Sequence, residues 1–179
     1  MTAEIAKRAG MGSHHSARAV KDEWLTPRFI LDALGPFDLD PCAPIERPWE
    51  MAAEHFTIAD DGLLRDWHGF VWCNPPYCSS TGVWLRKLHA HGNGIALIFA
   101  RTETADFVDG VWARADAAMF LHGRLFFHHV DGSRAKSNSG APSVLVAYGA
   151  EAVDRMGQSG LAGTLIKGWP RPSTAGALL

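Results

Sequence analysis

The chain has 179 residues, 47% of them hydrophobic, and a formal net charge of −2 at pH 7, which is typical of one soluble globular domain and does not announce a nucleic-acid binder. Its longest apolar stretches, such as 95–100, are far too short to cross a bilayer, and residues 1–21 lack the apolar core of a secretory signal. Three cysteines are an odd and sparse set, which favours reduced thiols in a cytosolic setting over a disulfide framework.

The first half of the chain predicts one helix and three short strands. Residues 1–21 are expected to form a flexible arm. A helix is predicted after Thr26-Pro27, with Thr26 as its N-cap and Gly35-Pro36 at its end. Short strands are predicted at 37–40, 55–58 and 70–73, with a possible helical turn over 49–55.

The second half predicts alternating helices and strands. Trp84, Leu85 and Leu88 fall at helical spacing, and the apolar run 94–100 reads as a strand buried on both faces. A further helix is predicted at 105–115. Strands are predicted at 117–121, 124–128 and 143–148, with a polar loop over 131–141. The folded domain is therefore expected to span 22–155, followed by a loosely ordered tail at 156–179 that is rich in Gly, Pro and Ser.

This alternation predicts an α/β sheet with parallel strands in its middle. Ligands of such sheets bind beyond the carboxyl ends of the strands. Asp40, an acid of the Asp60-Asp61 pair, Asn74 and Arg101 each follow a predicted strand. We therefore expect a functional site on this rim.

Asn74-Pro75-Pro76-Tyr77 directly follows the apolar run 70–73. Consecutive prolines lack N–H donors and preset their own φ, so the strand must end there in a rigid loop. Asn74 and a loop carbonyl could accept both N–H hydrogens of an exocyclic amine on adenine or cytosine, which makes the nitrogen lone pair available. Tyr77 could stack on the flat base. The segment thus predicts an acceptor site for methyl transfer to such an amine.

The methyl group must come from an activated donor, and S-adenosylmethionine is the candidate cofactor. Its sulfonium is a cation that aromatic faces and acidic neighbours stabilise, which makes Trp24 a candidate on the cofactor side. Asp40 and one of Asp60 and Asp61 are candidate partners for ribose hydroxyls or an adenine amine. The residues alone leave open which acid of the pair binds cofactor; the other belongs to the turn before Gly62.

Four segments, in this order, resemble the phage-type DNA N6-adenine methyltransferases of the Dam-like family. They are Asp22-Glu23-Trp24-Leu25-Thr26-Pro27, Phe37-Asp38-Leu39-Asp40-Pro41-Cys42-Ala43, Asp61-Gly62-Leu63 with Asp66-Trp67, and Asn74-Pro75-Pro76-Tyr77. The likeness spans 22 to about 148. It implies a compact, trimmed, Rossmann-like S-adenosylmethionine-dependent methyltransferase fold, with a mixed, mostly parallel sheet flanked by helices. It also implies that the target adenine is flipped out of double-stranded DNA.

The resemblance assigns roles to several of these residues. Those that border the S-adenosylmethionine pocket would be Thr26, Pro27, Asp40, Pro41, Cys42 and Ala43, with an acid of the Asp60-Asp61 pair at its other end. The catalytic loop would be Asn74, Pro75, Pro76 and Tyr77. The chain departs from the broader amino-methyltransferase pattern because no Gly-x-Gly loop follows its first strand. The interval from Asp40 to Asn74 is also short for two β-α units, so a trimmed sheet edge is expected.

Charge is distributed unevenly along the chain. Residues 35–66 carry eight acidic side chains against Arg47 and Arg65, whereas 74–102 carry none. One face could thus attract polyanions while another holds a cation. The candidate DNA contacts are Arg86, Lys87, Arg101, Arg124, Arg134 and Lys136. No separate target-recognition domain is evident, so specificity is expected from loops 78–82 or 131–141 and from the arm.

Other functions remain open at this level. The catalytic loop serves N4 of cytosine as well as N6 of adenine, and methylation of RNA or a protein glutamine uses the same loop. A binding module that retains the fold without transferring methyl groups is the non-enzymatic alternative. Cys73, Cys78, His89 and His91 lack a paired Cys-x-x-Cys spacing, so no metal site is predicted. The resemblance implies a phage or prophage origin, a cytoplasmic location in a bacterial host and a role in evading restriction; monomer and homodimer both remain open.

Overall fold

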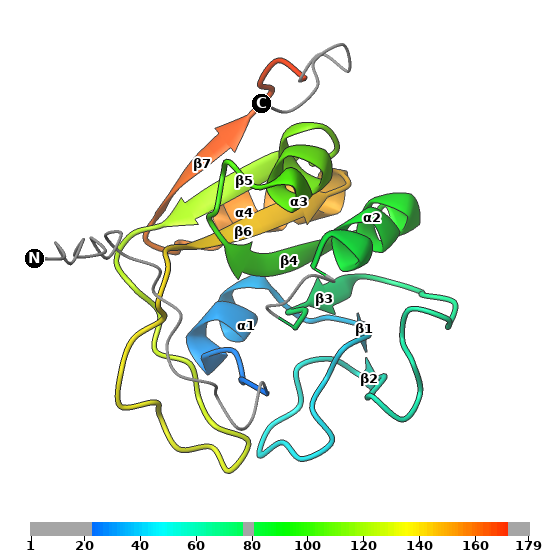
Figure 1. Cartoon of the computed structure of the whole chain (residues 1–179), viewed down its shortest axis with the longest axis vertical. Coiled ribbons are helices and arrows are strands. Elements are labelled where there is room, and N and C mark those ends of the chain that lie inside the picture. The colour runs from blue at the N-terminus through cyan, green and yellow to red at the C-terminus, as the bar shows by residue number, and fades with distance from the viewer. Residues whose placement is uncertain (1–22, 77–80, 172–179) are drawn as a thin grey trace, which may run out of the picture.

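Seven strands form one mixed sheet in the order β2-β1-β3-β4-β6-β5-β7, with helices on both of its faces (Figure 1). The computed structural model describes residues 23–76 and 81–171. The elements, in chain order, are α1 (Arg28–Leu34), β1 (Leu39–Asp40), β2 (Glu54–His55), β3 (Val71–Cys73), α2 (Thr81–His91), β4 (Gly94–Phe99), α3 (Ala105–Phe107), the π-helix η1 (Val108–Trp112), β5 (Ala117–Leu121), β6 (Ser143–Tyr148), α4 (Ala150–Gln158) and β7 (Gly163–Lys167).

The sheet is mixed, as the sequence predicted: its strand pairs are parallel from β2 to β4 and antiparallel from β4 to β7. β1 pairs in parallel with β2 and β3, and β3 pairs in parallel with β4. β6 lies antiparallel between β4 and β5, so β5 runs in the same direction as β4. β7 is antiparallel to β5. The arrangement is consistent with a trimmed Rossmann-like methyltransferase fold, which confirms the predicted fold class.

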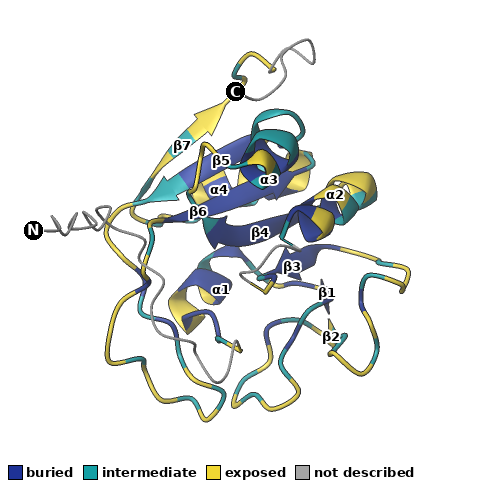
Figure 2. Ribbon diagram, viewed as in Figure 1, coloured by how far each residue is buried: buried dark blue, intermediate teal, exposed yellow. Residues whose placement is uncertain are grey.

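Two hydrophobic cores lie on opposite faces of the sheet because successive strand residues point to opposite sides. One core joins Ile95 and Leu97 of β4 to α1 and α4. The other joins Ala96 and Ile98 of the same strand to α2, α3 and η1. Figure 2 shows the result: β4 and β6 are buried along their length, whereas the helices and most connecting loops present exposed residues outward. The sheet is thus a rigid platform covered on both sides.

The edge beside β1 is short, as expected. β2 has two residues, and residues 41–53 and 56–70 contain no helix or strand. Backbone hydrogen bonds still tie this edge together, from Glu54 N to Asp38 O at 2.8 Å and from Phe56 N to Asp40 O at 2.8 Å. The wall of the molecule near β1 is therefore made of loops anchored to short strands.

Several predicted elements of the first half were wrong or shorter than predicted. The turn over 49–55 is not helical, and the strand predicted at 55–58 is β2, at Glu54–His55. Thr26 does not cap α1, because it lies one residue before the N-cap, which is Pro27, and no side chain caps the helix.

The second half shows three further differences. The helix predicted at 105–115 is split into α3 and η1. Residues 124–128 are not a strand: Leu125 and Phe127 are buried, but pairing is limited to isolated bridges from His128 to Leu25 and to Arg134. The tail predicted at 156–179 instead contains the end of α4 and all of β7, because β7 covers the open edge of β5 along five residue pairs. The predicted arm at 1–21 lies outside the described residues.

The start of β4 depends on close backbone packing, which predicts the effect of a small substitution. A Cβ at Gly94 would collide with the Val71 carbonyl oxygen and lie 2.9 Å from the Val71 Cβ. Gly94→Ala should lower the free energy of unfolding by about 2 kcal/mol, because neither strand can move aside without disturbing their pairing. Gly140→Ala is the matched control, since a Cβ there meets nothing within 4 Å. Urea denaturation measures both variants, and equal midpoints would contradict the prediction.

Candidate active site

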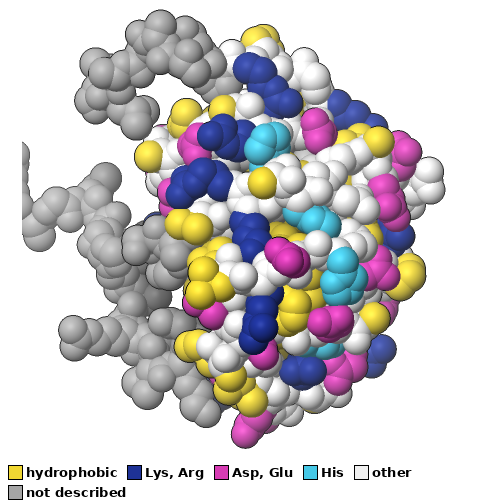
Figure 3. Space-filling model, turned by 90° about the vertical axis from the view of Figure 1, so that its right-hand side faces the viewer, with side chains coloured by type: hydrophobic (Ala, Val, Ile, Leu, Met, Phe, Trp, Pro, Cys, Tyr) yellow, Lys and Arg dark blue, Asp and Glu magenta, His cyan; other side chains and the backbone are white. Residues whose placement is uncertain are grey.

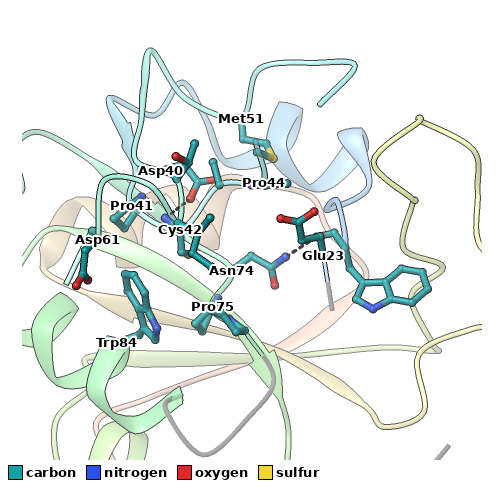
Figure 4. Close-up of a pocket in the computed structure, with 16 residues that line it drawn as sticks. Glu23, Asp40, Pro41, Cys42, Pro44, Met51, Asp61, Asn74, Pro75 and Trp84 are labelled. Carbon is teal, nitrogen blue, oxygen red and sulfur yellow. Dashed lines mark hydrogen bonds between the residues drawn. The ribbon is translucent and has the colours of Figure 1, made fainter. Parts of the chain in front are cut away.

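A cavity of about 510 Å³ opens beyond the carboxyl ends of β1 and β3 (Figure 4). Its volume lies in the range of cofactor and small-molecule sites. The residues that line it are Glu23, Trp24, Asp40, Pro41, Cys42, Ala43, Pro44, Met51, Thr57, Ile58, Asp61, Gly62, Asn74, Pro75, Pro76 and Trp84. Much of the lining is apolar, with a few convergent polar groups, as is typical of a site for a partly apolar ligand.

Asn74 lies at the centre of this lining in Figure 4. Its Nδ2 donates a hydrogen bond to the Trp24 carbonyl oxygen at 3.1 Å. A carbonyl can only accept, so this contact fixes which end of the amide carries nitrogen and which carries oxygen. Asn74 is half-buried, Pro75 is buried and Pro76 is exposed. Tyr77, the aromatic member of the predicted loop, lies outside the described residues.

Asp40 is a buried acid at the end of β1, with 2% of its surface exposed. Its Oδ1 accepts a hydrogen bond from the Cys42 backbone N–H at 3.0 Å. Burial raises the pKa of Asp40 to about 7, outweighing the Cys42 hydrogen bonds and the more distant Arg47 charge, which lower it. A carboxyl group with such a pKa can accept a hydrogen bond or donate one near neutral pH, and its position in a cavity marks it as a candidate ligand contact.

Asp60 and Asp61 occupy different environments. The Asp60 carboxylate accepts hydrogen bonds from the Thr57 N–H at 2.8 Å and the Thr57 hydroxyl at 2.9 Å. These bonds lower the pKa of Asp60 and make it part of the local turn. Asp61 instead lines the cavity, with a left-handed backbone at φ 51°. The next residue, Gly62, packs against the Pro41 carbonyl oxygen so closely that no Cβ could fit there.

Two thiols connect the loop after β1 to the end of β3. The Cys42 and Cys73 Sγ atoms lie 3.9 Å apart, and neither cysteine is in a disulfide. The hydrogen bond between them and burial hold the pKa of the Cys42 thiol well above its usual value. Cys42 therefore contributes an uncharged wall to the cavity rather than a reactive thiolate.

The structure brings together most of the predicted cofactor residues. Trp24, Asp40, Pro41, Cys42, Ala43 and Asp61 all line the cavity; Thr26, Pro27 and Asp60 do not. Thr26 and Pro27 are buried at the start of α1.

Several cavity residues were missed by the sequence reasoning. They are Glu23, Pro44, Met51, Thr57, Ile58, Gly62 and Trp84. Glu23 was part of a recognised segment, and Trp84 was read only as the inner face of a helix. Ile58 carries no motif; the structure distinguishes it as a large apolar side chain that is 85% exposed beside the cavity.

The predicted DNA contacts fall into two groups. Arg86 and Lys87 lie on α2, where Arg86 pairs with Asp109 at 3.2 Å and Lys87 donates to the Leu63 carbonyl at 2.7 Å. On the face shown in Figure 3, basic side chains are interspersed with acidic ones and with histidines. This face is therefore not uniformly basic.

The second group consists of basic residues that follow the carboxyl ends of β4 and β5. Arg101 follows β4 and is exposed, while Arg124, Arg134 and Lys136 are exposed in the segment after β5. β5 runs in the same direction as β4, so this segment leaves the sheet at the same edge as Asn74. These four side chains are therefore exposed in segments that follow strand ends on the side of the sheet where the cavity opens.

A family model described as DNA N-6-adenine-methyltransferase (Dam) matches residues 13–157, most of the chain. No curated protein and no solved structure matches the chain. Among the described residues, none of the helices is long and apolar enough to cross a membrane.

The raised pKa of Asp40 predicts a specific loss of stability with rising pH. The folded carboxyl group binds its proton more tightly than the unfolded one, whose pKa is 3.8. The contribution of Asp40 to the free energy of unfolding of the ligand-free protein should therefore be full below pH 3.8 and be lost as the pH rises through about 7. Asp40→Asn should remove this dependence and be more stable than the wild type at about pH 8, by on the order of 2 kcal/mol.

Urea unfolding at about pH 5 and about pH 8 measures this difference. Asp32→Asn, which alters an exposed acid on α1, is the control and should follow the wild type at both values. Identical pH profiles for Asp40→Asn and the wild type would contradict the assignment.

Proposed function

The chain belongs to the DNA N-6-adenine-methyltransferase (Dam) family, and we propose that it transfers a methyl group from S-adenosylmethionine to N6 of an adenine flipped out of double-stranded DNA. The observation that carries this proposal is the hydrogen bond from Asn74 Nδ2 to the Trp24 carbonyl at 3.1 Å. It sets the catalytic amide so that its oxygen, the group that an exocyclic amine needs, points away from the Trp24 carbonyl. The reaction further requires a donor site next to this amide.

The cavity fits S-adenosylmethionine by its chemistry. The acids Asp40 and Asp61 suit ribose hydroxyls and an adenine amine, while the apolar walls of Pro41, Ala43 and Trp84 suit the purine and the carbon chain. When bound, S-adenosylmethionine supplies an activated methyl group on a sulfonium. The chain has no Gly-x-Gly loop after its first strand, and the segment 40–43 is proposed to take its role. Within this segment the Cys42 N–H donates a hydrogen bond to Asp40 Oδ1 at 3.0 Å. We propose that Asp61, not Asp60, is the second acidic partner.

The role of Asn74 is to hold the adenine amine and to change its electronic state. The Asn74 oxygen and a carbonyl of the proline loop would accept its two N–H hydrogens. This favours a pyramidal nitrogen whose lone pair is no longer delocalised into the ring, without any strong base. Pro75 and Pro76 keep the loop rigid, so the acceptors need little reorganisation during the reaction. Tyr77 is proposed to stack on the base.

The DNA is proposed to lie against Arg101 and the segment 122–142. This segment carries Arg124, Arg134 and Lys136 against one acid, Asp131, and leaves the sheet at the edge of the cavity. Arg and Lys contacts to phosphate supply most of the affinity for DNA and position the duplex. Arg86 and Lys87 are proposed only as peripheral contacts, because both already bond within the protein.

The biological setting is proposed from the resemblance to phage-type enzymes. The protein would act on specific sites, in the cytoplasm of a bacterial host, from a phage or prophage gene. Mapping the modified positions after expression in a methylation-deficient host tests site specificity, and dispersed modification without a common sequence would contradict it.

Asn74→Ala tests the mechanism directly. We expect methyl transfer to unmethylated duplex DNA to fall by about 100-fold or more, since the amine loses a fixed acceptor. Calorimetry should show that cofactor binding is retained. Gln158→Ala, which removes an exposed amide at the end of α4, is the matched control and should keep full activity. Chromatography of the nucleosides identifies the product: N4-methylcytosine would overturn the choice of adenine, and full activity of Asn74→Ala would overturn the mechanism.

Asp61→Asn tests the cofactor half. Asparagine tolerates the left-handed backbone at this position, so the variant removes the charge with little strain. We expect S-adenosylmethionine to bind about tenfold more weakly, with an unchanged free energy of unfolding. Asp66→Asn, a nearby exposed acid, should bind as the wild type does. If the wild type itself gives no heat with S-adenosylmethionine, the chain is a binding remnant and not an enzyme.

A further inference from the structure

The segment 122–142 is joined to Asn74 by an unbroken series of hydrogen bonds and one covalent step. Leu25 N–H donates to the His128 carbonyl at 2.8 Å, and His128 N–H donates back to the Leu25 carbonyl at 3.0 Å. The residue before Leu25 is Trp24, whose carbonyl holds the Asn74 amide. The only covalent step in this series is therefore the peptide unit between Trp24 and Leu25.

The far side of His128 is also paired. His128 and Arg134 form an antiparallel bridge, and the turn between them is closed by hydrogen bonds from His129 N–H to the Ser133 carbonyl and from Gly132 N–H to the His129 carbonyl, both at 2.8 Å. Leu25, His128 and Arg134 thus lie side by side as three short extended pieces. The Arg134 guanidinium stacks on the ring of Phe126, 3.9 Å from its centroid, so the side chain is held against the same segment.

Side-chain contacts reinforce this connection. The rings of His129 and Trp24 are 4.9 Å apart, and the ring of His128 meets Trp49 edge-on at 5.4 Å. Leu25 is fully buried, so its backbone has little freedom to move independently of the segment. In Figure 1 this segment follows β5 and runs beside the start of the described chain, beyond the edge of the sheet.

We propose that the segment 122–142 is a positioning element for catalysis: its pairing with Leu25 sets the Trp24 carbonyl and thereby the orientation of the Asn74 amide. This inference rests on the proposed function. It adds that Arg134, a proposed DNA contact, belongs to the same segment that orients the catalytic amide. Binding of DNA to this segment then stabilises the arrangement that the reaction requires. His129 is the testable positioning residue, because its ring contacts Trp24 while its side chain does not line the cavity.

The first test compares His129→Ala with His129→Phe and His68→Ala. His129→Ala should lower kcat about three- to tenfold, the range expected when one hydrogen bond is no longer held in place, with KM for S-adenosylmethionine unchanged. His129→Phe keeps a ring against Trp24 and should restore kcat. His68→Ala is the matched control, since His68 is an exposed histidine outside both the cavity lining and the segment 122–142, and its ring contacts Glu54 at 3.5 Å. A loss seen only as a higher KM for DNA would overturn the proposal.

A second measurement does not depend on activity. The side-chain NH₂ signals of Asn74 can be assigned by NMR from their absence in Asn74→Asp. In His129→Ala, and more strongly in His128→Pro, which lacks the N–H that donates to Leu25, these signals should shift and their hydrogens should exchange faster. Unchanged signals in both variants would overturn the proposal. If the wild type proves inactive, the proposed function fails, and the NMR result alone decides whether the segment orients Asn74.

Discussion

The parallel pairing of β3 with β1 places the carboxyl ends of these two strands next to each other, and the cavity depends on this arrangement. Pro75 and Pro76 have no N–H to continue β3, so its chain must leave the sheet immediately after Cys73. Asp40 is the last residue of β1, the strand next to β3. The Asn74 amide and the Asp40 carboxyl group therefore lie in one cavity because of strand direction, although they are far apart in the sequence.

Burial gives the two acids of the cavity different properties. Asp40 is enclosed, and the loss of solvent outweighs the hydrogen bonds that it accepts. Asp61 is exposed, and its backbone adopts the left-handed conformation, which is unfavourable for a residue other than glycine. The protein thus bears the cost of desolvation at one wall and of backbone strain at the other. Both costs are of the kind found at ligand sites, where a bound molecule can offset them.

Much of the sheet could be predicted because its strands carry strong local signals. Residues 94–99 and 143–148 are continuous apolar runs, and Pro75-Pro76 marks the end of β3 without ambiguity. Residues 124–128 misled the prediction because Leu125 and Phe127 are buried as in a strand, yet among the described residues only His128 of this run is bridged, to Leu25 and to Arg134. The tail was predicted to be loosely ordered because of its Gly and Pro content. Five of its residues nevertheless form β7, because they pair with the open edge of β5. Asp60 and Asp61 could not be separated, since only the fold decides which one faces Thr57 and which the cavity.

The loop-built wall beside β1 has an evolutionary consequence. Residues 41–53 and 56–70 contain no helix or strand, yet they supply Pro41, Met51, Ile58 and Asp61 to the cavity. Loops of this kind accept insertions and deletions far more readily than strands do. Asn74, in contrast, is fixed at the end of a strand in the middle of the sheet. Changes in the length of these loops during evolution can therefore alter this wall of the cavity without moving Asn74.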